Sequence, residues 1–196
     1  RKGWCLKGGG GGCGSCRALD GGETWQELTD GLPTGEKGRI GLDIYRPDGN
    51  VVFAIVEANP RAPGGGFGGG GSGQSGVYKS VDRGESWEKV SDTNNRPMYY
   101  SQIRIDPNDS ERLYTGGSNL FRSSDGGKTF TPDGAAGVHL DHHALWIDPS
   151  DSDHLILGSD GGVSVSWDRS DSWRQLYNLP ISQFYEIGLD MRDPYH

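Results

Sequence analysis

The chain has 196 residues, of which 27 are acidic and 19 basic, so its formal net charge at pH 7 is −8. Nucleic-acid binding needs clustered Lys and Arg to neutralise phosphates. The sequence holds no basic block, and we expect no nucleic-acid partner. No apolar run approaches the roughly 20 residues that span a bilayer, and we expect no membrane insertion.

Glycine and cysteine distinguish the first 16 residues, which hold a glycine tract and all three cysteines, Cys5, Cys13 and Cys16. Cys13 and Cys16 have metal-ligand spacing, but no second CxxC or HxxxH pair follows, so we predict neither a zinc site nor any other cofactor. The glycine total of 34 also includes a second tract at 64–76. The remaining glycines are typical of a fold with many tight turns.

Two motifs repeat along the chain. The first has the frame S-x-D-x-G-x-S/T-W/F, and its copies are ALDGGETW at 18–25, SVDRGESW at 80–87, SSDGGKTF at 123–130 and SWDRSDSW at 166–173. The second is an alternating apolar strand that ends in Asp, at 40–43, 103–106, 145–148 and 187–190. Both recur every 42 or 43 residues over their last three copies. The chain is therefore predicted to be built from structural repeats.

Each repeat predicts four short strands, and no helical periodicity of useful length is present. We expect strands at 102–105, 113–115, 120–123 and from 129 onwards, and then at 143–147, 155–157, 162–166 and 172–176. This pattern indicates an all-β fold, a β-propeller of four-stranded antiparallel blades whose third and fourth strands are joined by the Asp motif. About three and a half blades are too few to close a ring, so we expect a partial propeller whose partner is the remainder of a larger one.

The repeats predict the divisions of the chain. The predicted divisions begin with an atypical Gly/Cys-rich N-terminus at 1–16 and the end of a blade at 17–35. A blade at 36–96 with a Gly-rich insertion at 57–76 follows, and then two further blades at 97–137 and 138–180. The first strand of another blade lies at 181–196.

The Asp motif has a structural interpretation. A short carboxylate in a turn accepts hydrogen bonds from backbone N–H groups two residues on, and the following glycine supplies a positive φ. We expect the aromatic residue that ends each motif to anchor the hairpin under the next sheet. The predicted pairs are Asp20 with Trp25, Asp82 with Trp87, Asp125 with Phe130, and Asp168 with Trp173. In the fourth copy Ser170 replaces the glycine, which predicts the most strained turn.

With these motifs, the chain resembles the Asp-box (BNR-repeat) β-propellers. Residues 96–107 (RPMYYSQIRIDP) and 139–168 (HLDHHALWIDPSDSDHLILGSDGGVSVSWD) look most like bacterial sortilin/Vps10-like repeat proteins. More distantly, the chain resembles xyloglucanase-like glycoside hydrolases and photosystem II assembly-factor-like proteins. The resemblance implies a secreted, periplasmic or cell-surface protein, and ligands that are peptides, proteins or polysaccharides.

Propeller geometry places the candidate site. The connections into the first strand of each blade, and those between its second and third strands, open on one face around the central channel, where propellers usually bind ligands. On this channel face we predict ligand-binding residues Arg39, Tyr99, Tyr100, Gln102, His142, His143, Gln183 and Tyr185. Aromatic rings beside carboxylates and amides suit a peptide or a sugar, although rings that simply fill the channel rim are an equal alternative.

Metal binding and catalysis are secondary interpretations. His139, Asp141 and His143 would point to one side of an extended strand, but residues two apart diverge by ~7 Å, and no metal site is predicted. An inverting glycosidase needs two carboxylates about 6.5–9.5 Å apart, for which the candidates are Asp141, Asp160 and Glu186. No GxSxG or P-loop sequence is present. We therefore favour a non-catalytic binding scaffold, with a glycoside hydrolase as the alternative.

Overall fold

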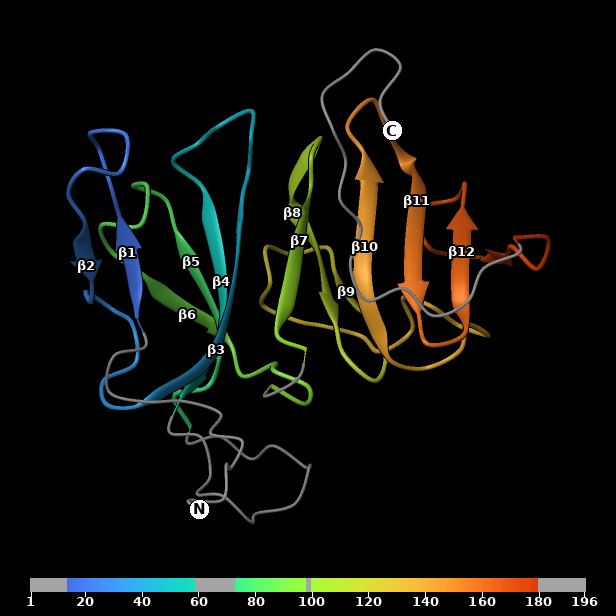
Figure 1. Cartoon of the computed structure of the whole chain (residues 1–196), viewed down its shortest axis with the longest axis horizontal. Coiled ribbons are helices and arrows are strands. Elements are labelled where there is room, and N and C mark those ends of the chain that lie inside the picture. The colour runs from blue at the N-terminus through green and yellow to red at the C-terminus, as the bar shows by residue number, and fades with distance from the viewer. Residues whose placement is uncertain (1–13, 59–72, 98–99, 180–196) are drawn as a thin grey trace, which may run out of the picture.

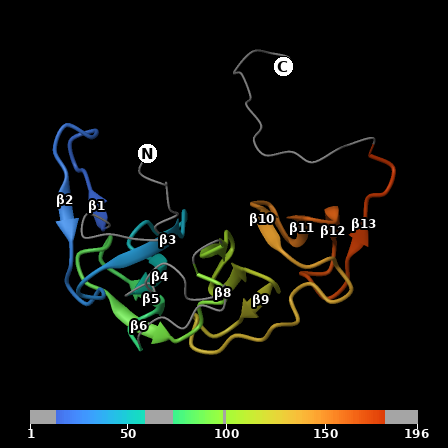
Figure 2. The ribbon, with the colours of Figure 1, turned by 60° about the horizontal axis from the view of Figure 1, so that its bottom comes forward.

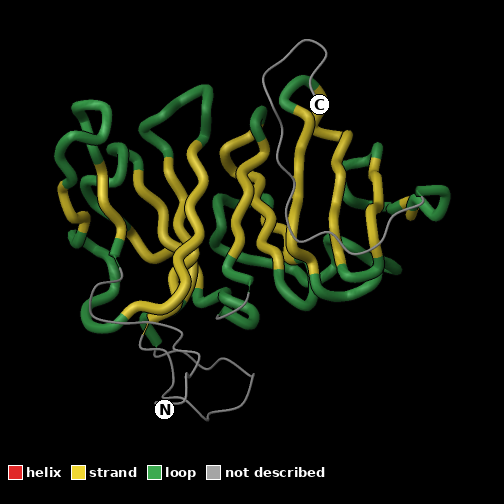
Figure 3. Tube along the Cα trace, in the orientation of Figure 1, coloured by secondary structure: helices red, strands yellow, loops and turns green. Residues whose placement is uncertain are grey.

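The computed structural model describes residues 14–58, 73–97 and 100–179, and in these ranges the chain contains strands and loops but no helix (Figure 3). In the described ranges, thirteen strands form four antiparallel sheets. The first sheet contains β1 (Ser15–Arg17) and β2 (Gln26–Leu28). The second contains β3 (Lys37–Ile44), β4 (Val52–Ala58), β5 (Gly76–Ser80) and β6 (Glu88–Ser91).

The remaining two sheets repeat the same order. The third contains β7 (Gln102–Asp106), β8 (Asp109–Gly116) and β9 (Phe121–Ser123). The fourth contains β10 (His142–Asp148), β11 (Asp151–Ser159), β12 (Gly162–Ser166) and β13 (Arg174–Gln175). In each sheet, strands that are consecutive in sequence are neighbours in space. The sheets lie side by side in chain order (Figure 1), and a rotated view shows that they follow an arc (Figure 2). This is the arrangement of blades in part of a β-propeller.

The third sheet lacks a regular fourth strand. Where we expected a strand from 129 onwards, a single bridge joins Arg122 to Thr131. Pro132 follows directly and has no backbone N–H, so it cannot continue the ladder of hydrogen bonds.

The hydrophobic core lies between consecutive sheets. Phe53, Ile55 and Val77 of the second sheet pack against Ile103, Ile105 and Leu113 of the third. Tyr114 and Leu120 of the third sheet pack against four aliphatic side chains of the fourth, Leu145, Ile147, Leu155 and Leu157. Strand β4 is buried along its whole length because it faces a sheet on each side, which explains the five consecutive apolar residues at 52–56.

The innermost strands approach one another closely. A Cβ at Gly41 in β3 would lie 2.1 Å from the carbonyl oxygen of Ser101, which immediately precedes β7, so only glycine fits at this position. Two aspartates at or near the ends of the innermost strands also connect the sheets. Asp43 accepts a hydrogen bond of 2.8 Å from the Ile105 N–H, and the fully buried Asp106 accepts one of 2.6 Å from the Ser152 hydroxyl. The sequence showed these aspartates as a motif without giving them a role.

The four Asp-motif hairpins share one hydrogen-bond pattern. Asp82 accepts bonds from the Ser86 N–H (3.0 Å), the Ser86 hydroxyl (2.5 Å) and the Ser80 hydroxyl (2.7 Å). These donors, led by the Ser86 hydroxyl, lower the pKa of Asp82 to about 2, and Thr129 does the same for Asp125. In the fourth hairpin Ser170 has φ +74°, a left-handed conformation that Gly84 adopts at the equivalent place without a Cβ penalty.

The aromatic residues of the motif do not pack as expected. Trp87 is 7% exposed and lies against Leu28 and Leu32, which precede its own sheet in the chain. Phe130 and Trp173 likewise join the cluster shared with the preceding sheet, so the prediction that they anchor under the next sheet was wrong. Trp25 is 65% exposed because the described residues include no sheet before β1 that could cover it.

Candidate functional site

One polar cluster stands at the edge where β7 and β10 begin. Arg96 and Tyr100 precede β7, Asp141 directly precedes β10, and His143 is its second residue. Ser118 comes from the turn between β8 and β9, and Asp160 from the turn between β11 and β12. We call these six residues the edge network: Arg96, Tyr100, Ser118, Asp141, His143 and Asp160. They come from the segments that lead into β7 and β10 and from the turns between the second and third strands of the third and fourth sheets.

Arg96 links the two sheets at this edge. Its Nη1 donates hydrogen bonds to the Asp141 Oδ1 (3.2 Å) and to the Ser118 Oγ (3.0 Å). The guanidinium carbon also lies 5.5 Å from the centre of the Tyr100 ring, within range of a cation–π contact. The Arg96 and Asp141 side chains are 38% and 28% exposed, so this ion pair remains in contact with solvent.

Tyr100 and His143 form the second half of the network. Their ring centres are 5.0 Å apart, and the His143 Nε2 lies 3.1 Å from the Asp160 Oδ1. Tyr100 is only 2% exposed, and its hydroxyl group is hydrogen-bonded to Asp141. Burial, followed by the Asp141 carboxylate, raises the pKa of Tyr100 to about 12. The phenol is therefore protonated at neutral pH and acts as a hydrogen-bond donor.

The backbone under this network is strained. Arg96, Ser101 and Asp141 have φ angles of +54°, +39° and +68°, a region that side chains with a Cβ rarely occupy. Hydrogen bonds maintain the conformation: the Asp141 N–H donates to the Ser118 carbonyl (3.1 Å), and the Asp160 N–H donates to the Asp141 carbonyl (3.3 Å). Strain of this kind collects at ligand-binding and catalytic sites because surrounding structure must maintain it.

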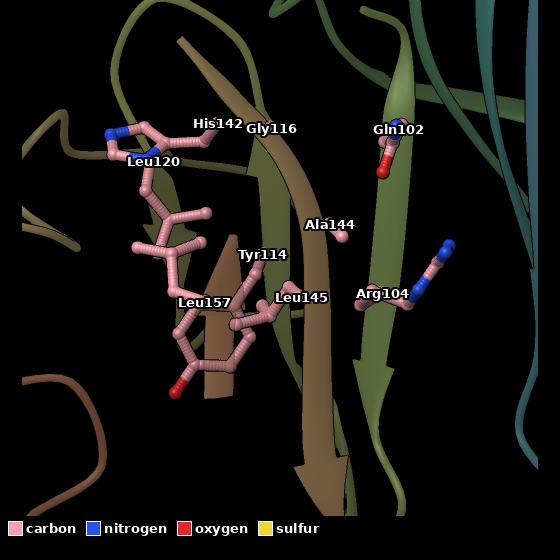
Figure 4. Close-up of a pocket in the computed structure, with 9 residues that line it drawn as sticks. All are labelled: Gln102, Arg104, Tyr114, Gly116, Leu120, His142, Ala144, Leu145 and Leu157. Atoms are coloured by element: carbon pink, nitrogen blue, oxygen red, sulfur yellow. The ribbon is translucent and has the colours of Figure 1, made fainter. Parts of the chain in front are cut away.

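The other predicted ligand residues are dispersed. Arg39 lies in β3 of the second sheet, where its N–H bonds the Glu57 carboxylate at 3.1 Å and burial raises the pKa of Glu57. Gln102 lines a cavity of about 10 Å³ between the third and fourth sheets, together with His142 (Figure 4). Tyr99, Gln183, Tyr185 and Glu186 lie outside the described residues.

His142 is placed inside the protein. It is 2% exposed, its Nδ1 has no hydrogen-bond partner, and burial lowers its pKa. In Figure 4 its ring lies beside Leu120, within the cavity lining. A ligand at this edge cannot reach the His142 ring or the equally buried Tyr100 ring, which contradicts the ligand contacts predicted for both residues.

The three residues considered as a possible metal site do not come together in the structure. Asp141 has a positive φ and β10 begins only at His142, so His139, Asp141 and His143 do not alternate along one strand as supposed. The His139 Nδ1 lies 2.9 Å from the Leu140 carbonyl oxygen, while Asp141 and His143 engage Arg96 and Asp160. Within the described ranges, no group of three His, Cys, Asp or Glu side chains could hold a metal ion.

Sequence reasoning missed Arg96 and Ser118. Arg96 precedes Pro97 and two tyrosines, and its position four residues before Tyr100 was the available signal, because a guanidinium readily covers an aromatic ring. Ser118 gave no signal, since its contact with Arg96 joins residues 22 positions apart.

The described part of the chain contains no helix that is long and apolar enough to span a membrane.

Comparison with known proteins gives the fold. No family model matches the chain, and no curated protein matches it by sequence. Among solved structures, the chain is similar to the GH74 xyloglucanase from Xanthomonas campestris, with a TM-score of 0.55 and 18% identity over 80% of this chain and 26% of that one. It is also similar to the Niastella koreensis GH74 enzyme, with a TM-score of 0.56 and 16% identity over 88% of this chain and 30% of that one.

A structure of YCF48 bound to a D1 peptide is a weaker match. Its TM-score is 0.48, with 18% identity over 79% of this chain and 45% of that one, and no argument rests on it. The chain spans less than a third of the two GH74 structures. At these identities the likeness concerns the fold alone, and it agrees with the arc of four-stranded sheets. The chain is thus an all-β protein built of β-propeller blades.

Proposed function

We propose that the chain is a binding scaffold whose edge network recognises a peptide, protein or glycan without chemical turnover. The observation that carries this proposal is the edge network itself. It combines donors and acceptors of both charges from two sheets, on a backbone strained at three positions. Binding sites commonly consist of such polar groups, held rigidly by a scaffold and presented from loops.

The exposures fit a ligand that is itself polar. The His143 and Asp160 side chains are 39% and 52% exposed, and the Arg96 side chain is 38% exposed. Each of these groups can reach a ligand while keeping its partner within the network. The buried Tyr100 ring sets the position of Arg96 and His143 from below. A ligand with amide or hydroxyl groups would match these donors and acceptors.

The same geometry disfavours catalysis. A glycosidase needs one carboxylic acid that donates a proton and a second carboxylate that is free to act as base or nucleophile. Here Asp141 accepts a bond from Arg96, and Asp160 lies against His143, so neither carboxylate is free. Tyr100, whose pKa is about 12, is no better placed as a nucleophile.

A glycoside hydrolase remains the second candidate, supported by one observation. The backbones of Asp141 and Asp160 are joined by a hydrogen bond of 3.3 Å, so two candidate carboxylates lie on adjacent segments of one face. If the chain is a hydrolase, it forms part of a larger propeller enzyme, and a bound polysaccharide displaces the basic side chains that contact the two carboxylates.

We further propose that the chain belongs to the Asp-box propellers, with a sortilin/Vps10-like protein as the closest type, and that it acts outside the cytoplasm. Support for the family comes from the shared hydrogen-bond pattern of the hairpins. In each copy the carboxylate accepts bonds from the N–H and the hydroxyl of the residue four positions on, as Asp20 does from Thr24.

The test is binding and turnover in parallel. The 196-residue chain is applied to glycan and peptide arrays, and the best ligand is then titrated against Asp141→Asn, Arg96→Gln and Glu88→Gln. Asn tolerates the positive φ at position 141, so the first variant removes charge without removing the backbone conformation. Glu88 is exposed on β6, away from the network, and serves as a matched charge-removal control.

We expect the two network variants to weaken binding by about tenfold or more, since each loses a charge-assisted hydrogen bond, and the control to bind normally. Release of reducing sugar from xyloglucan or a β-glucan, abolished by Asp141→Asn while binding is retained, would establish the hydrolase instead. Normal binding by both network variants would reject the edge network as the site.

A further inference from the structure

A second polar site lies at the opposite end of the strands. It is a cavity of about 370 Å³ between the Asp-motif hairpins of the third and fourth sheets. Three guanidinium groups line it, from Arg112 in β8, Arg122 in β9 and Arg169 in the hairpin after β12, together with Ser124 and Asp171. Ser124 follows the end of β9, and Arg169 and Asp171 follow the end of β12, so the cavity is separate from the edge network at the start of β10. This inference is independent of the proposed function.

Two of the three arginines have carboxylate partners. Arg122 donates from Nε and Nη2 to both oxygens of Asp133, at 3.1 Å each, and from Nη1 to Asp171 at 2.5 Å. These contacts raise the pKa of Arg122, and the Asp171 bond joins the third sheet to the fourth. Arg169 donates from Nε to Asp153 at 2.9 Å.

Arg112 differs from the other two. Within the described ranges, no carboxylate lies within 4 Å of its guanidinium, and its Nε is buried without a hydrogen-bond partner. The neighbouring carboxylate of Glu111 is engaged by Lys79 at 3.1 Å. The Arg112 side chain does contact Tyr114, whose hydroxyl is neutral. A half-buried cation that lacks a counter-ion is costly, and a bound anion removes that cost.

We propose that this cavity binds a tetrahedral oxyanion, the sulfate or phosphate group of a ligand, with Arg112 as its principal partner. The donors favour this shape because they approach from three separate elements, β8, the β9 hairpin and the β12 hairpin. A planar carboxylate is satisfied by a single guanidinium fork, whereas a tetrahedral group presents oxygens in several directions. Ser124 is exposed at the cavity and adds a hydroxyl donor.

The experiment titrates inorganic sulfate, inorganic phosphate and acetate into the 196-residue chain by calorimetry at constant ionic strength, which is maintained with chloride. The variants are Arg112→Gln, which removes the unpaired cation, and Ser124→Asp, which places a carboxylate beside the guanidinium groups on an exposed hairpin residue. Arg46→Gln is the matched control, because Arg46 is exposed in the turn after β3 and lines no cavity described here. Circular dichroism checks that each variant is folded.

We expect sulfate and phosphate to bind the native chain and the Arg46→Gln control with equal affinity. We expect Arg112→Gln and Ser124→Asp to weaken binding by about tenfold or more, as the loss of a charge-assisted hydrogen bond implies. If Arg112→Gln does not fold, Ser124→Asp alone decides the result. Absence of binding to the native chain, unchanged binding in Ser124→Asp, or acetate binding as tight as that of sulfate would each overturn the proposal.

Discussion

Replacing Leu113 by Ala tests whether the packing between sheets holds the fold together. Leu113 is fully buried in β8, in the cluster that it forms with Phe53, Ile55 and Val77 of the second sheet. The substitution removes three carbons, which at about 0.8 kcal/mol each accounts for roughly 2.4 kcal/mol of transfer free energy. The cavity left behind brings the expected loss to about 3–5 kcal/mol. For a chain of this size, that lowers the midpoint of thermal unfolding by roughly 6–20 °C.

Urea unfolding, followed by circular dichroism and by tryptophan fluorescence, measures the effect. Trp87, one of the six tryptophans of the chain, is buried on the far side of the second sheet and contributes a signal from that sheet. We expect both signals to shift together, because the cluster belongs to two sheets at once. Leu42→Ala is the control, since Leu42 lies in β3 but is 49% exposed. A loss below about 1 kcal/mol at Leu113, or an equal loss at Leu42, would refute the idea that inter-sheet packing dominates stability.

Two further predictions concern backbone contact and acid. Gly41→Ala should lower the thermal midpoint by several degrees, because its Cβ would meet the Ser101 carbonyl oxygen at 2.1 Å. Gly49→Ala is the control and should leave the midpoint nearly unchanged, since no atom lies within 4 Å of the added carbon. Equal midpoints for the two variants would contradict the close approach. Hydrogen bonds hold the pKa values of Asp82 and Asp125 at about 2 in the folded chain, below the ordinary aspartate value of 3.8. Their stabilisation is therefore complete above about pH 4 and is lost as the pH falls from 4 to 2. Thermal midpoints measured across this range should fall less steeply for Asp82→Asn, and an unchanged slope would show that the hairpin carboxylate is not responsible.

Several elements could be read from the sequence because their causes are local. The strand expected at 162–166 is β12 with the same bounds, and that expected at 102–105 is β7 with one residue more. Alternating apolar residues and a carboxylate-closed turn are encoded within about ten consecutive positions, which is why such features repeat visibly. The strand expected at 113–115 is longer in the structure, where β8 runs from Asp109 to Gly116. Asp109 pairs with Asp106 across a register irregularity, a contact between polar residues that no apolar alternation marks in the sequence.

Only part of the candidate site could be predicted from the sequence. Tyr100, Asp141, His143 and Asp160 were placed on one face by alignment of the repeats, and the structure brings them together. Their partner Arg96 was missed, since its bond to Asp141 joins residues 45 positions apart. The inward position of His142 was also missed, because a register irregularity between His142 and Ala144 interrupts the alternation of side chains at the start of β10.

The sequence by itself determined the period of the repeat, the strand order within each sheet and the hairpin chemistry, since each depends on residues close together in the chain. The tertiary structure alone decided which sheet covers each aromatic anchor, which arginine lacks a counter-ion and which carboxylates acquire a basic partner. Those outcomes depend on contacts between neighbouring sheets, whose residues are some forty positions apart, and no local pattern encodes the distance between them.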